Sequence, residues 1–283
     1  MLMASLRKLL EAPTPADLAA IDPRSTPGLP KAARKAADPK AWSAAELATL
    51  GTELAGLQER MYASTRENGN QRLLIVLQAM DAGGKDGLVR HVGGAFNPLG
   101  LEVTSFKAPT KEELRHHFLW RIRNRLPESG HVGIFNRSHY EDVLIVRVHD
   151  LVPETEWRGR YDEINAFERD LVNDGVILVK IMLHISPTEQ LARLRERLED
   201  PTKFWKYNPA DVDERARWDD YRVAYTEALT RCSEAAPWYV VPADRKWYRN
   251  WAVASLLVEI LSAENPQYPP ATFDLAAEKK RLG

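Results

Sequence analysis

The stretch LLIVLQAMDAGGKDGLVRHV, residues 73 to 92, decides the fold class of this chain. Its first six residues are almost entirely apolar, which predicts a buried strand at 73 to 78. A glycine-rich turn follows and leads into a helical pattern. Glycines let a backbone approach a phosphate closely, and the free N–H groups and dipole at a helix start favour anions. The stretch therefore predicts a strand–loop–helix unit that binds phosphate.

The loop of this unit carries the candidate phosphate-binding residues, which are Gly83, Gly84, Lys85, Asp86 and Gly87. It departs from GxxxxGK[ST], because Ala79 stands where the first glycine would be and Asp86 replaces the usual magnesium-binding Ser or Thr. Asp81 would repel a phosphate unless a cation intervened. We therefore interpret it as a ligand for Mg²⁺ or Mn²⁺, or as the group that orients an attacking phosphate. The alternative is an ordinary turn in which Asp81 is the N-cap.

Four further apolar runs predict the rest of a sheet. They are EVTSFKA (102 to 108), HVGIFN (131 to 136), VILVKIMLHI (176 to 185) and WYVVPA (238 to 243). Helical patterns alternate with them, which is typical of βαβ units and of a sheet covered on both faces. We therefore predict the α/β class and a three-layer α/β/α sandwich around a mainly parallel five-stranded sheet.

The chain divides into three parts by pattern. Prolines crowd the first 41 residues, which predicts an irregular arm, and Ser43 with Glu46 forms a capping box before an amphipathic helix. We assign this arm and helix to 1–65, the α/β core to 66–265 and a tail to 266–283. A further capping box, Ser186 with Glu189 and a proline between them, marks the helix after the fourth strand.

A second polar cluster follows the third predicted strand, in FNRSHYEDV (135 to 143). Ligands of open α/β sheets bind outside the carboxyl ends of the strands, so this cluster should meet the glycine loop. Arg137 is suited to clamp phosphoryl oxygens, and Glu141 to hold a second metal or a basic acceptor group. We interpret His139 as structural. The alternative for the whole cluster is a solvated helix start.

The segment RHHFLWRIRNR (115 to 125) has four arginines and no acid. Thr110 and Glu113 form a capping box before it, which predicts a helix. Such a row of cations could line a channel for a polyanion, or it could contact another subunit.

Composition limits the partners and the compartment. Lysine and arginine number 39 against 40 acids, a net charge of −1, which favours neither nucleic-acid nor membrane binding. The single Cys232 excludes an internal disulfide, fits a reducing cytoplasm, and reads as a small buried hydrophobe. Lys180 interrupts the longest apolar run, and early charge in MLMASLRKLLEA argues against a signal peptide. We expect a cytoplasmic protein.

Several motifs together resemble one family. DAGGKDG, TSFKAPT, GIFNRSHYE, KFWKYNP and ERARWDDY are similar, in this order, to motifs of the family-2 polyphosphate kinases. The likeness covers about 43–262 and is strongest to the subgroup that phosphorylates both nucleoside mono- and diphosphates. It implies a P-loop kinase-like sandwich. It also implies Mg²⁺-assisted, in-line and reversible transfer of the terminal phosphoryl group of inorganic polyphosphate to AMP and ADP, with ATP as a further product.

The resemblance also implies roles for single residues. Asp81 corresponds to the essential loop carboxylate and Lys85 to the phosphate-binding lysine. Arg137 corresponds to a phosphate or nucleotide ligand, whereas Asn136 stands where many relatives carry an aspartate. Glu141 matches the subgroup that uses mono- and diphosphates, so it is the candidate for acceptor choice. Lys107, within the second motif, is a further phosphate contact.

For such an enzyme, the segment LARLRERLEDPTKFWKYNPADVDERARWDDY (191 to 221) predicts a mobile helical lid at about 195–225. Its candidate phosphate- or nucleotide-binding cations are Arg197, Lys203, Lys206 and Arg215, and the alternative for each is a solvated helix face. We interpret Trp205, Trp218 and Tyr221 as packing residues of the lid, with base stacking as the alternative.

The family likeness suggests a homodimer or homotetramer. Two other functions remain open. One is an ATP-dependent P-loop nucleoside or nucleotide kinase, which shares the fold and the loop chemistry. The other is a non-catalytic nucleotide-binding regulator, which we would expect to lack the loop carboxylate or lysine, although Asp81 and Lys85 are both present.

Overall fold

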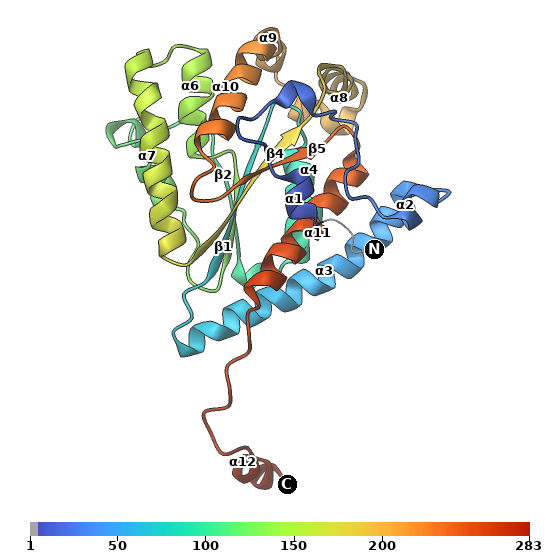
Figure 1. Cartoon of the computed structure of the whole chain (residues 1–283), viewed down its shortest axis with the longest axis vertical. Helices are drawn as coiled ribbons and strands as arrows, with labels where there is room; N and C mark the ends of the chain where they lie inside the picture. Colours follow the sequence, from blue (N-terminus) through green and yellow to red (C-terminus); the bar gives the residue numbers. More distant parts are fainter. Residues whose placement is uncertain (1–4) are drawn as a thin grey trace.

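The computed structural model describes residues 5–283 of the chain. Residues 1–4, which begin the predicted arm and the stretch MLMASLRKLLEA, lie outside this range. Figure 1 shows a central sheet surrounded by helices, with a C-terminal helix that projects from the body. Among the described residues, no helix is both long and apolar enough to cross a membrane.

The sheet has five strands, and every pairing in it is parallel. The strand order is β2-β3-β1-β4-β5, so β1 lies at the centre between β3 and β4. The predicted sheet and sandwich are confirmed, although β2 begins one residue before and ends three residues before the run that predicted it. The strands are β1 (Arg72–Ala79), β2 (Leu101–Ser105), β3 (Val132–Asn136), β4 (Val176–His184) and β5 (Trp238–Pro242).

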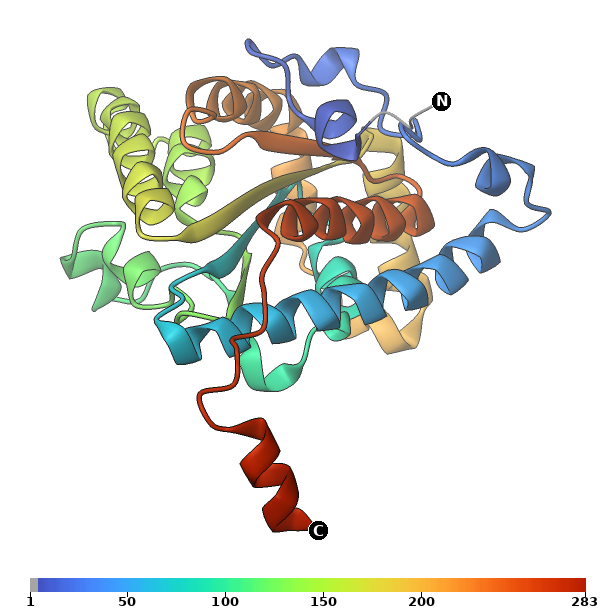
Figure 2. The ribbon, with the colours of Figure 1, turned by 60° about the horizontal axis from the view of Figure 1, so that its bottom comes forward.

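Helices cover both faces of the sheet, as Figure 2 shows. One face carries α3 (Pro39–Ser64), α4 (Lys85–Val92) and α11 (Lys246–Glu264). The other face carries α6 (Ile145–Val148), α7 (Glu154–Asn173) and α10 (Trp218–Arg231). The long helices α3 and α11 pack along each other, and α11 also contacts α4 and β5. These contacts place the start of α11 beside the glycine loop, which matters for the site.

Shorter elements complete the chain. The α-helices are α1 (Leu6–Leu10), α2 (Lys31–Lys35), α5 (Trp120–Arg123), α8 (Pro187–Glu199), α9 (Ala210–Ala216) and α12 (Leu275–Leu282). The 3-10 turns are η1 (Leu18–Ala20), η2 (Thr65–Glu67), η3 (Gly93–Ala95), η4 (Pro98–Gly100), η5 (Glu113–Arg115), η6 (His139–Val143) and η7 (Pro201–Lys206).

The N-terminal arm is more ordered than its prolines predict. Helix α1 packs on α11 and β5, and Leu10 and Leu18 are buried in the main core. The prediction that Ser43 and Glu46 form the capping box of the next long helix is wrong. Helix α3 begins at Pro39, and the side chain of Asp38 accepts hydrogen bonds from its first turn. Ser43 therefore lies inside the helix and donates to the carbonyl of Trp247. An acid before a proline is the stronger start signal here.

The predicted helix at 115 to 125 is not continuous. Thr110 and Glu113 do form the reciprocal capping box, with bonds of 2.8 and 3.2 Å. Only one 3-10 turn follows, however, and the chain becomes helical again in α5. In contrast, α8 begins as predicted, because Ser186 Oγ accepts the N–H of Glu189 at 3.0 Å.

A buried ion pair joins the sheet to the helix layer on one side. Lys180, in the middle of β4, lies 2.5 Å from a carboxylate oxygen of Glu168 in α7, and neither side chain is exposed. Lys180 Nζ also donates to the hydroxyl of Tyr140 and to the carbonyl of Cys232. The Tyr140 hydroxyl donates to Glu168, and the buried His139 lies 3.2 Å from the same carboxylate. His139 is thus structural, as predicted, and the network fixes the turn that carries Glu141.

We expect Lys180→Met to lower the free energy of unfolding by about 3–5 kcal/mol, because it leaves the buried carboxylate of Glu168 without the lysine that neutralises it. The double variant Lys180→Met/Glu168→Gln should be more stable than the sum of the single changes predicts. Urea unfolding of the unchanged protein, the two single variants and the double variant measures the loss of stability and the interaction energy of the pair.

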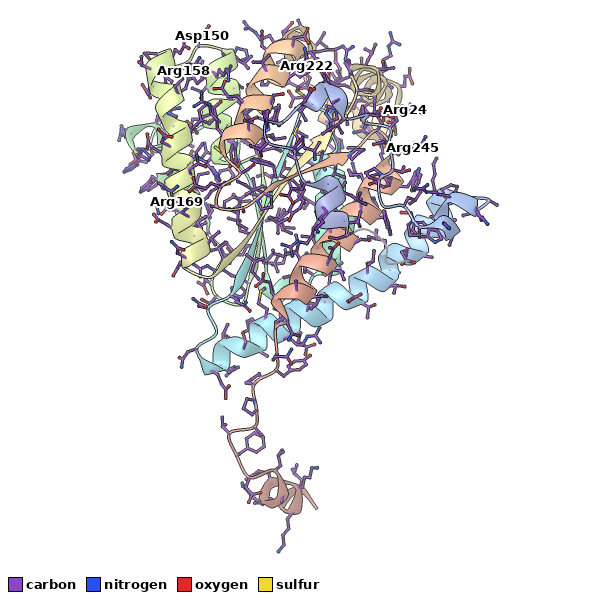
Figure 3. All side chains as sticks on the ribbon, viewed as in Figure 1. Arg24, Asp150, Arg158, Arg169, Arg222 and Arg245 are labelled. Carbon is purple, nitrogen blue, oxygen red and sulfur yellow. The ribbon has the colours of Figure 1, made fainter. Side chains whose placement is uncertain are left out.

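The matched control is Arg169→Met, which breaks the exposed pair with Glu234 and should cost under about 1 kcal/mol. Arg169 lies on the outside of α7 in Figure 3. A Lys180→Met variant as stable as this control would contradict the structural role of the buried pair.

Candidate active site

The glycine loop connects the end of β1 to the start of α4. Gly84 is the N-cap of α4 and has a φ of 98°, a conformation that favours glycine. A Cβ atom at Gly84 would lie 2.1 Å from Nη1 of Arg249, and one at Gly83 would lie 2.5 Å from the Cβ of Ala79. The loop therefore requires glycine at both positions. Because Gly84 is the N-cap, the alternative interpretation of Asp81 as the cap is wrong.

Lys85 is buried behind this loop. Its ammonium donates to the carbonyl of Ala79 at 2.9 Å and forms no ion pair within the described residues. Burial lowers the pKa of Lys85, and the charge of Arg137 lowers it further, while Asp81 and Glu141 oppose the shift. A buried cation without a bound carboxylate leaves its charge available to an anionic ligand.

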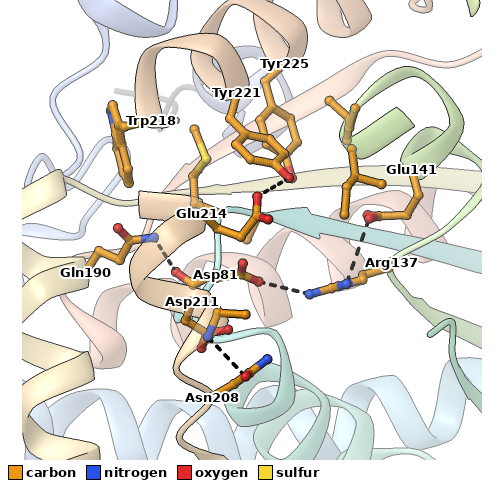
Figure 4. A pocket seen from close by; sticks show the side chains of 15 residues that line it. Asp81, Arg137, Glu141, Gln190, Asn208, Asp211, Glu214, Trp218, Tyr221 and Tyr225 are labelled. Atoms are coloured by element: carbon orange, nitrogen blue, oxygen red, sulfur yellow. Dashed lines mark hydrogen bonds and ion pairs between the residues drawn. The ribbon is translucent and has the colours of Figure 1, made fainter. Parts of the chain in front are cut away.

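Arg137 connects the two polar clusters. It directly follows β3 with a φ of 65°, which is uncommon for a residue with a side chain. Its guanidinium lies 2.9 Å from Asp81 and 4.0 Å from Glu141. Figure 4 marks both contacts with dashed lines. Burial alone would lower the pKa of Arg137, but the carboxylates of Glu141 and Asp81 raise it. Burial raises the pKa of Glu141, against the charges of Arg137 and Lys85. The three predicted side chains meet at the carboxyl ends of β1 and β3.

A cavity of about 240 Å³ lies on one side of this contact, and we call it the aromatic pocket. Figure 4 shows its lining. Carboxylates outnumber cations in it, since Asp81, Glu141, Asp211 and Glu214 face a single arginine, Arg137. The hydroxyl of Tyr221 donates to Glu214 at 2.6 Å. The apolar and aromatic surface of the pocket comes mainly from Leu144, Ile145, Trp218, Tyr221 and Tyr225.

A larger cavity of about 770 Å³ lies on the other side, and we call it the cationic groove. Ten lysine or arginine side chains line it against four carboxylates, although the whole chain has a net charge of −1. The two cavities share Asp81, Arg137, Asn208 and Asp211. The cations of the groove are Lys85, Arg90, Lys107, Arg137, Arg193, Arg197, Lys203, Lys206, Lys246 and Arg249.

Most of the residues selected from the sequence line one of these cavities. Besides the cations above, the groove includes Gly83, Gly84, Asp86, Gly87 and Asn136. Asn136 donates its amide to Asp86 at 2.8 Å. Arg215 lines neither cavity, because it donates to the carbonyl of Pro187 and to Gln190 and so ties α9 to α8.

The arginines of 115 to 125 also line neither cavity, so this segment lies outside the cationic groove. Within it, Arg115 pairs with Glu112, and Arg121 pairs with Glu113. Both acids precede the segment. Because the helix is interrupted after its first turn, the chain brings Arg115 and Arg121 back to these acids. The cations of the groove come instead mainly from α4, α8, η7 and α11.

The segment predicted as a lid spans α8, η7, α9 and the start of α10. Arg197 joins α8 to both α9 and η7, since it pairs with Asp211 at 2.8 Å and donates to the carbonyl of Lys206. Trp205 is 77% exposed at the edge of the groove, so its interpretation as a packing residue is wrong. Trp218 and Tyr221 are partly buried and line the aromatic pocket.

Sequence reasoning missed four cations of the groove and one support of the loop. Arg193 donates to the carbonyl of Ala82 at 3.0 Å, and Gln190 to the carbonyl of Asp81 at 3.0 Å. Arg193 lies one helical turn before Arg197, so the two share a face of the helix. This spacing could have identified Arg193 from the sequence as a further cation of the groove. The other missed cations are Arg90, Lys246 and Arg249, and the last is the only charged residue from Trp247 to Val258.

The donor set of the loop fits a magnesium ion held mainly by substrate oxygens. Within residues 5–283 there is no group of three or more His, Cys, Asp or Glu side chains suited to a metal. Asp81 offers a carboxylate at the point where the two cavities meet, and one of its oxygens is bound by Arg137. Magnesium commonly takes one or two carboxylates and completes its shell with water and phosphate oxygens.

The fold and the site define a P-loop kinase-like α/β protein with a phosphate loop at the end of its central strand. Residues 38–269 match the family model of polyphosphate kinase 2 (PPK2). The chain belongs to the polyphosphate kinase 2 family.

Individual relatives agree with this assignment. The chain is 49% identical over 234 residues to the AMP/ADP-polyphosphate phosphotransferase of Meiothermus ruber, covering 82% of this chain and 85% of that protein. It is 44% identical to the ADP-polyphosphate phosphotransferase of Rhodopseudomonas palustris, covering 83% and 84%. The crystal structure of polyphosphate kinase 2 from Arthrobacter aurescens superposes with a TM-score of 0.93 at 46% identity, covering 100% of this chain and 98% of that chain.

The carboxyl group of Asp142, next to Glu141, should make the stability of the protein depend on pH. Burial raises the pKa of Asp142 to about 6 from 3.8, with Glu141 adding to the shift and Arg160 opposing it. The folded state therefore binds this proton more tightly than the unfolded state, so stability is lost as the pH rises from about 4 to about 6. We expect Asp142→Asn to gain stability relative to the unchanged protein over this window, by at most about 3 kcal/mol.

Urea unfolding at several pH values between 4 and 7 measures this difference. The control is Asp219→Asn, which changes an exposed carboxylate. A stability difference between Asp142→Asn and the unchanged protein that stays constant across these pH values would disprove the proposed shift.

Proposed function

We propose that this chain transfers the terminal phosphoryl group of inorganic polyphosphate to AMP and ADP, reversibly and with Mg²⁺ or Mn²⁺. The observation that carries the proposal is the meeting of the cationic groove and the aromatic pocket at Asp81 and Arg137. A donor bound in the groove and an acceptor bound in the pocket would have their reacting ends at this contact. The names of the Meiothermus ruber and Rhodopseudomonas palustris relatives support these substrates.

The cationic groove has the chemistry that a polyphosphate donor requires. A chain of repeating phosphates presents charge and no base or sugar, so it is best bound by a row of cations. The groove supplies ten such side chains, mainly from α4, α8, η7 and the start of α11. An ATP-dependent kinase would bind a donor with a base, and the assay below separates the two by omitting ATP.

The aromatic pocket suits the nucleotide acceptor. Trp218, Leu144 and Ile145 offer flat and apolar surface to a base. Arg137 lies next to Asp81, where it would bind the acceptor phosphate. Glu141 lies 4.0 Å from Arg137, so it can act on the acceptor phosphate or on its counter-ion.

The chemistry is in-line transfer that depends on positioning and charge. The attacking phosphate oxygen of AMP or ADP is already anionic near neutral pH, so a general base contributes little. Lys85 and Arg137 would stabilise the negative charge on the transferred group. When bound at Asp81, the divalent ion would neutralise phosphate charge there. A non-catalytic regulator is disfavoured because Asp81 and Lys85 lie at one site with Arg137.

We further propose a cytoplasmic homodimer or homotetramer. The buried, unpaired Cys232 supports a reducing compartment, and the family likeness supports assembly. Light scattering of the purified protein tests the oligomeric state.

The purified protein, incubated with Mg²⁺, AMP and long-chain polyphosphate but no ATP, should produce ADP and then ATP. Asp81→Asn and Lys85→Ala should each reduce turnover by at least about 100-fold, because each removes a charge at the transfer point. Asp219→Asn is the control and should keep its activity. Near-normal turnover in either site variant, with an unchanged fold by circular dichroism, would refute the assigned roles.

Glu141→Ala should change the choice of acceptor. We expect kcat/KM for AMP to fall by about tenfold relative to that for ADP, and KM for polyphosphate to stay within about twofold, since Glu141 lines only the aromatic pocket. Steady-state kinetics with each acceptor measure the ratio. An unchanged ratio of AMP to ADP use would remove Glu141 as the determinant of acceptor choice.

A further inference from the structure

Four lysine or arginine residues are buried in the described part of the chain, and their ion pairing divides them into two kinds. Lys180 pairs with Glu168, and Arg193 pairs with Glu189. Lys85 and Arg249 pair with no carboxylate among residues 5–283. Both unpaired residues line the cationic groove, on the glycine loop itself or against it. Lys85 is already assigned to phosphate binding, whereas Arg249 has no assigned role.

Arg249 is held firmly against the glycine loop. Its side chain is 2% exposed, in the first turns of α11. Nη1 donates to the carbonyl of Gly84 at 3.1 Å, and Nε and Nη2 donate to the side chain of Asn250 at 3.0 and 2.7 Å. These bonds use three of the five N–H groups of the guanidinium, so two remain for a ligand. The hydrogen bonds fix the orientation of the group but supply no negative charge.

This position is electrostatically unfavourable without an anion. An unpaired charge is costly to bury, and burial together with the charge of Arg193 lowers the pKa of Arg249 to about 10. The start of a helix also favours negative charge, yet α11 has Arg245 as N-cap, Lys246 next and no acid in its first turn. Three cations therefore crowd a helix end that repels them, and a bound polyanion would relieve all of these costs.

We propose that Arg249 binds the phosphate chain of the donor in the cationic groove, as a fixed anchor on the α11 side of the glycine loop. The inference rests on the proposed function, because it names a donor-binding residue of the same site. Arg249 does not line the aromatic pocket, so it should act on the donor and not on the acceptor.

The test compares Arg249→Met and Arg249→Lys with the unchanged protein. Inorganic tripolyphosphate is titrated by calorimetry without nucleotide, and KM is measured separately for long-chain polyphosphate and for AMP. We expect Arg249→Met to weaken tripolyphosphate binding and raise KM for polyphosphate by about tenfold or more, with KM for AMP within about twofold. Arg249→Lys should have an intermediate affinity for tripolyphosphate and an intermediate KM for polyphosphate, because lysine keeps the charge but loses the planar guanidinium.

Arg245→Met is the matched control. Arg245 lies four residues earlier at the same helix end, is exposed and lines neither cavity. Figure 3 shows it at the surface. It should change tripolyphosphate binding by less than about twofold, since an exposed charge is screened by solvent. This control separates a direct contact from a general effect of positive charge near α11.

Two outcomes would overturn the inference. One is normal tripolyphosphate binding by Arg249→Met. The other is an equal rise of both KM values with a loss of turnover in both Arg249 variants, which would show that the residue only supports the loop. The proposed function fails separately, if the unchanged protein binds tripolyphosphate but forms no ADP from AMP and polyphosphate.

Discussion

The ion pair between Asp81 and Arg137 is the contact on which the rest of the site depends. It exists because the strand order places β1 beside β3, so that the loop after one strand faces the turn after the other. The pair forms the boundary between the two cavities, and both include the same two side chains. A carboxylate and a guanidinium at this boundary balance each other in the free protein. In the proposed mechanism the carboxylate would turn to a metal ion and the guanidinium to a phosphate. The parallel sheet thus determines where phosphate transfer can occur.

The charges on the two sides of this contact differ in sign. The charged side chains of the aromatic pocket are mostly carboxylates. The groove has ten cations, and two of these are buried without an acid partner. Such an arrangement lowers the stability of the free protein, because like charges repel and buried charges lose their hydration. The paired Lys180 and Glu168, on the far side of the sheet from the groove-lining α4 and α11, show that the same fold neutralises a buried cation where no ligand is needed. Unpaired charge is therefore concentrated where a polyanion would bind.

The sequence predicts the parts of this structure that depend on local pattern. Every strand except the largely exposed edge strand β2 is an apolar run, and the cap at Ser186 combines a hydroxyl, a proline and an acid within four residues. The prediction failed where two local signals compete, as at Ser43, which Asp38 and Pro39 override. It also failed at 115 to 125, where nearby acids pair with the arginines. Arg249 could not be placed from sequence, because its position depends on how α11 packs against α3 and α4.

The segment predicted as a lid has two parts that are bound to the site in different ways. Helix α8 is fastened to the loop, since Gln190 donates to the carbonyl of Asp81 and Arg193 donates to that of Ala82. Movement of α8 would therefore break the bonds that shape the phosphate loop. The part from η7 to α9 is held to α8 by Arg197, by Arg215 and by the ion pair of Lys203 with Glu196. Opening this part would release Asp211 from Arg197 and would leave the loop bonds of α8 intact. If the segment opens to admit substrates, the physical cost is lowest for η7 and α9, and Arg215 then acts as a closing contact without touching a phosphate.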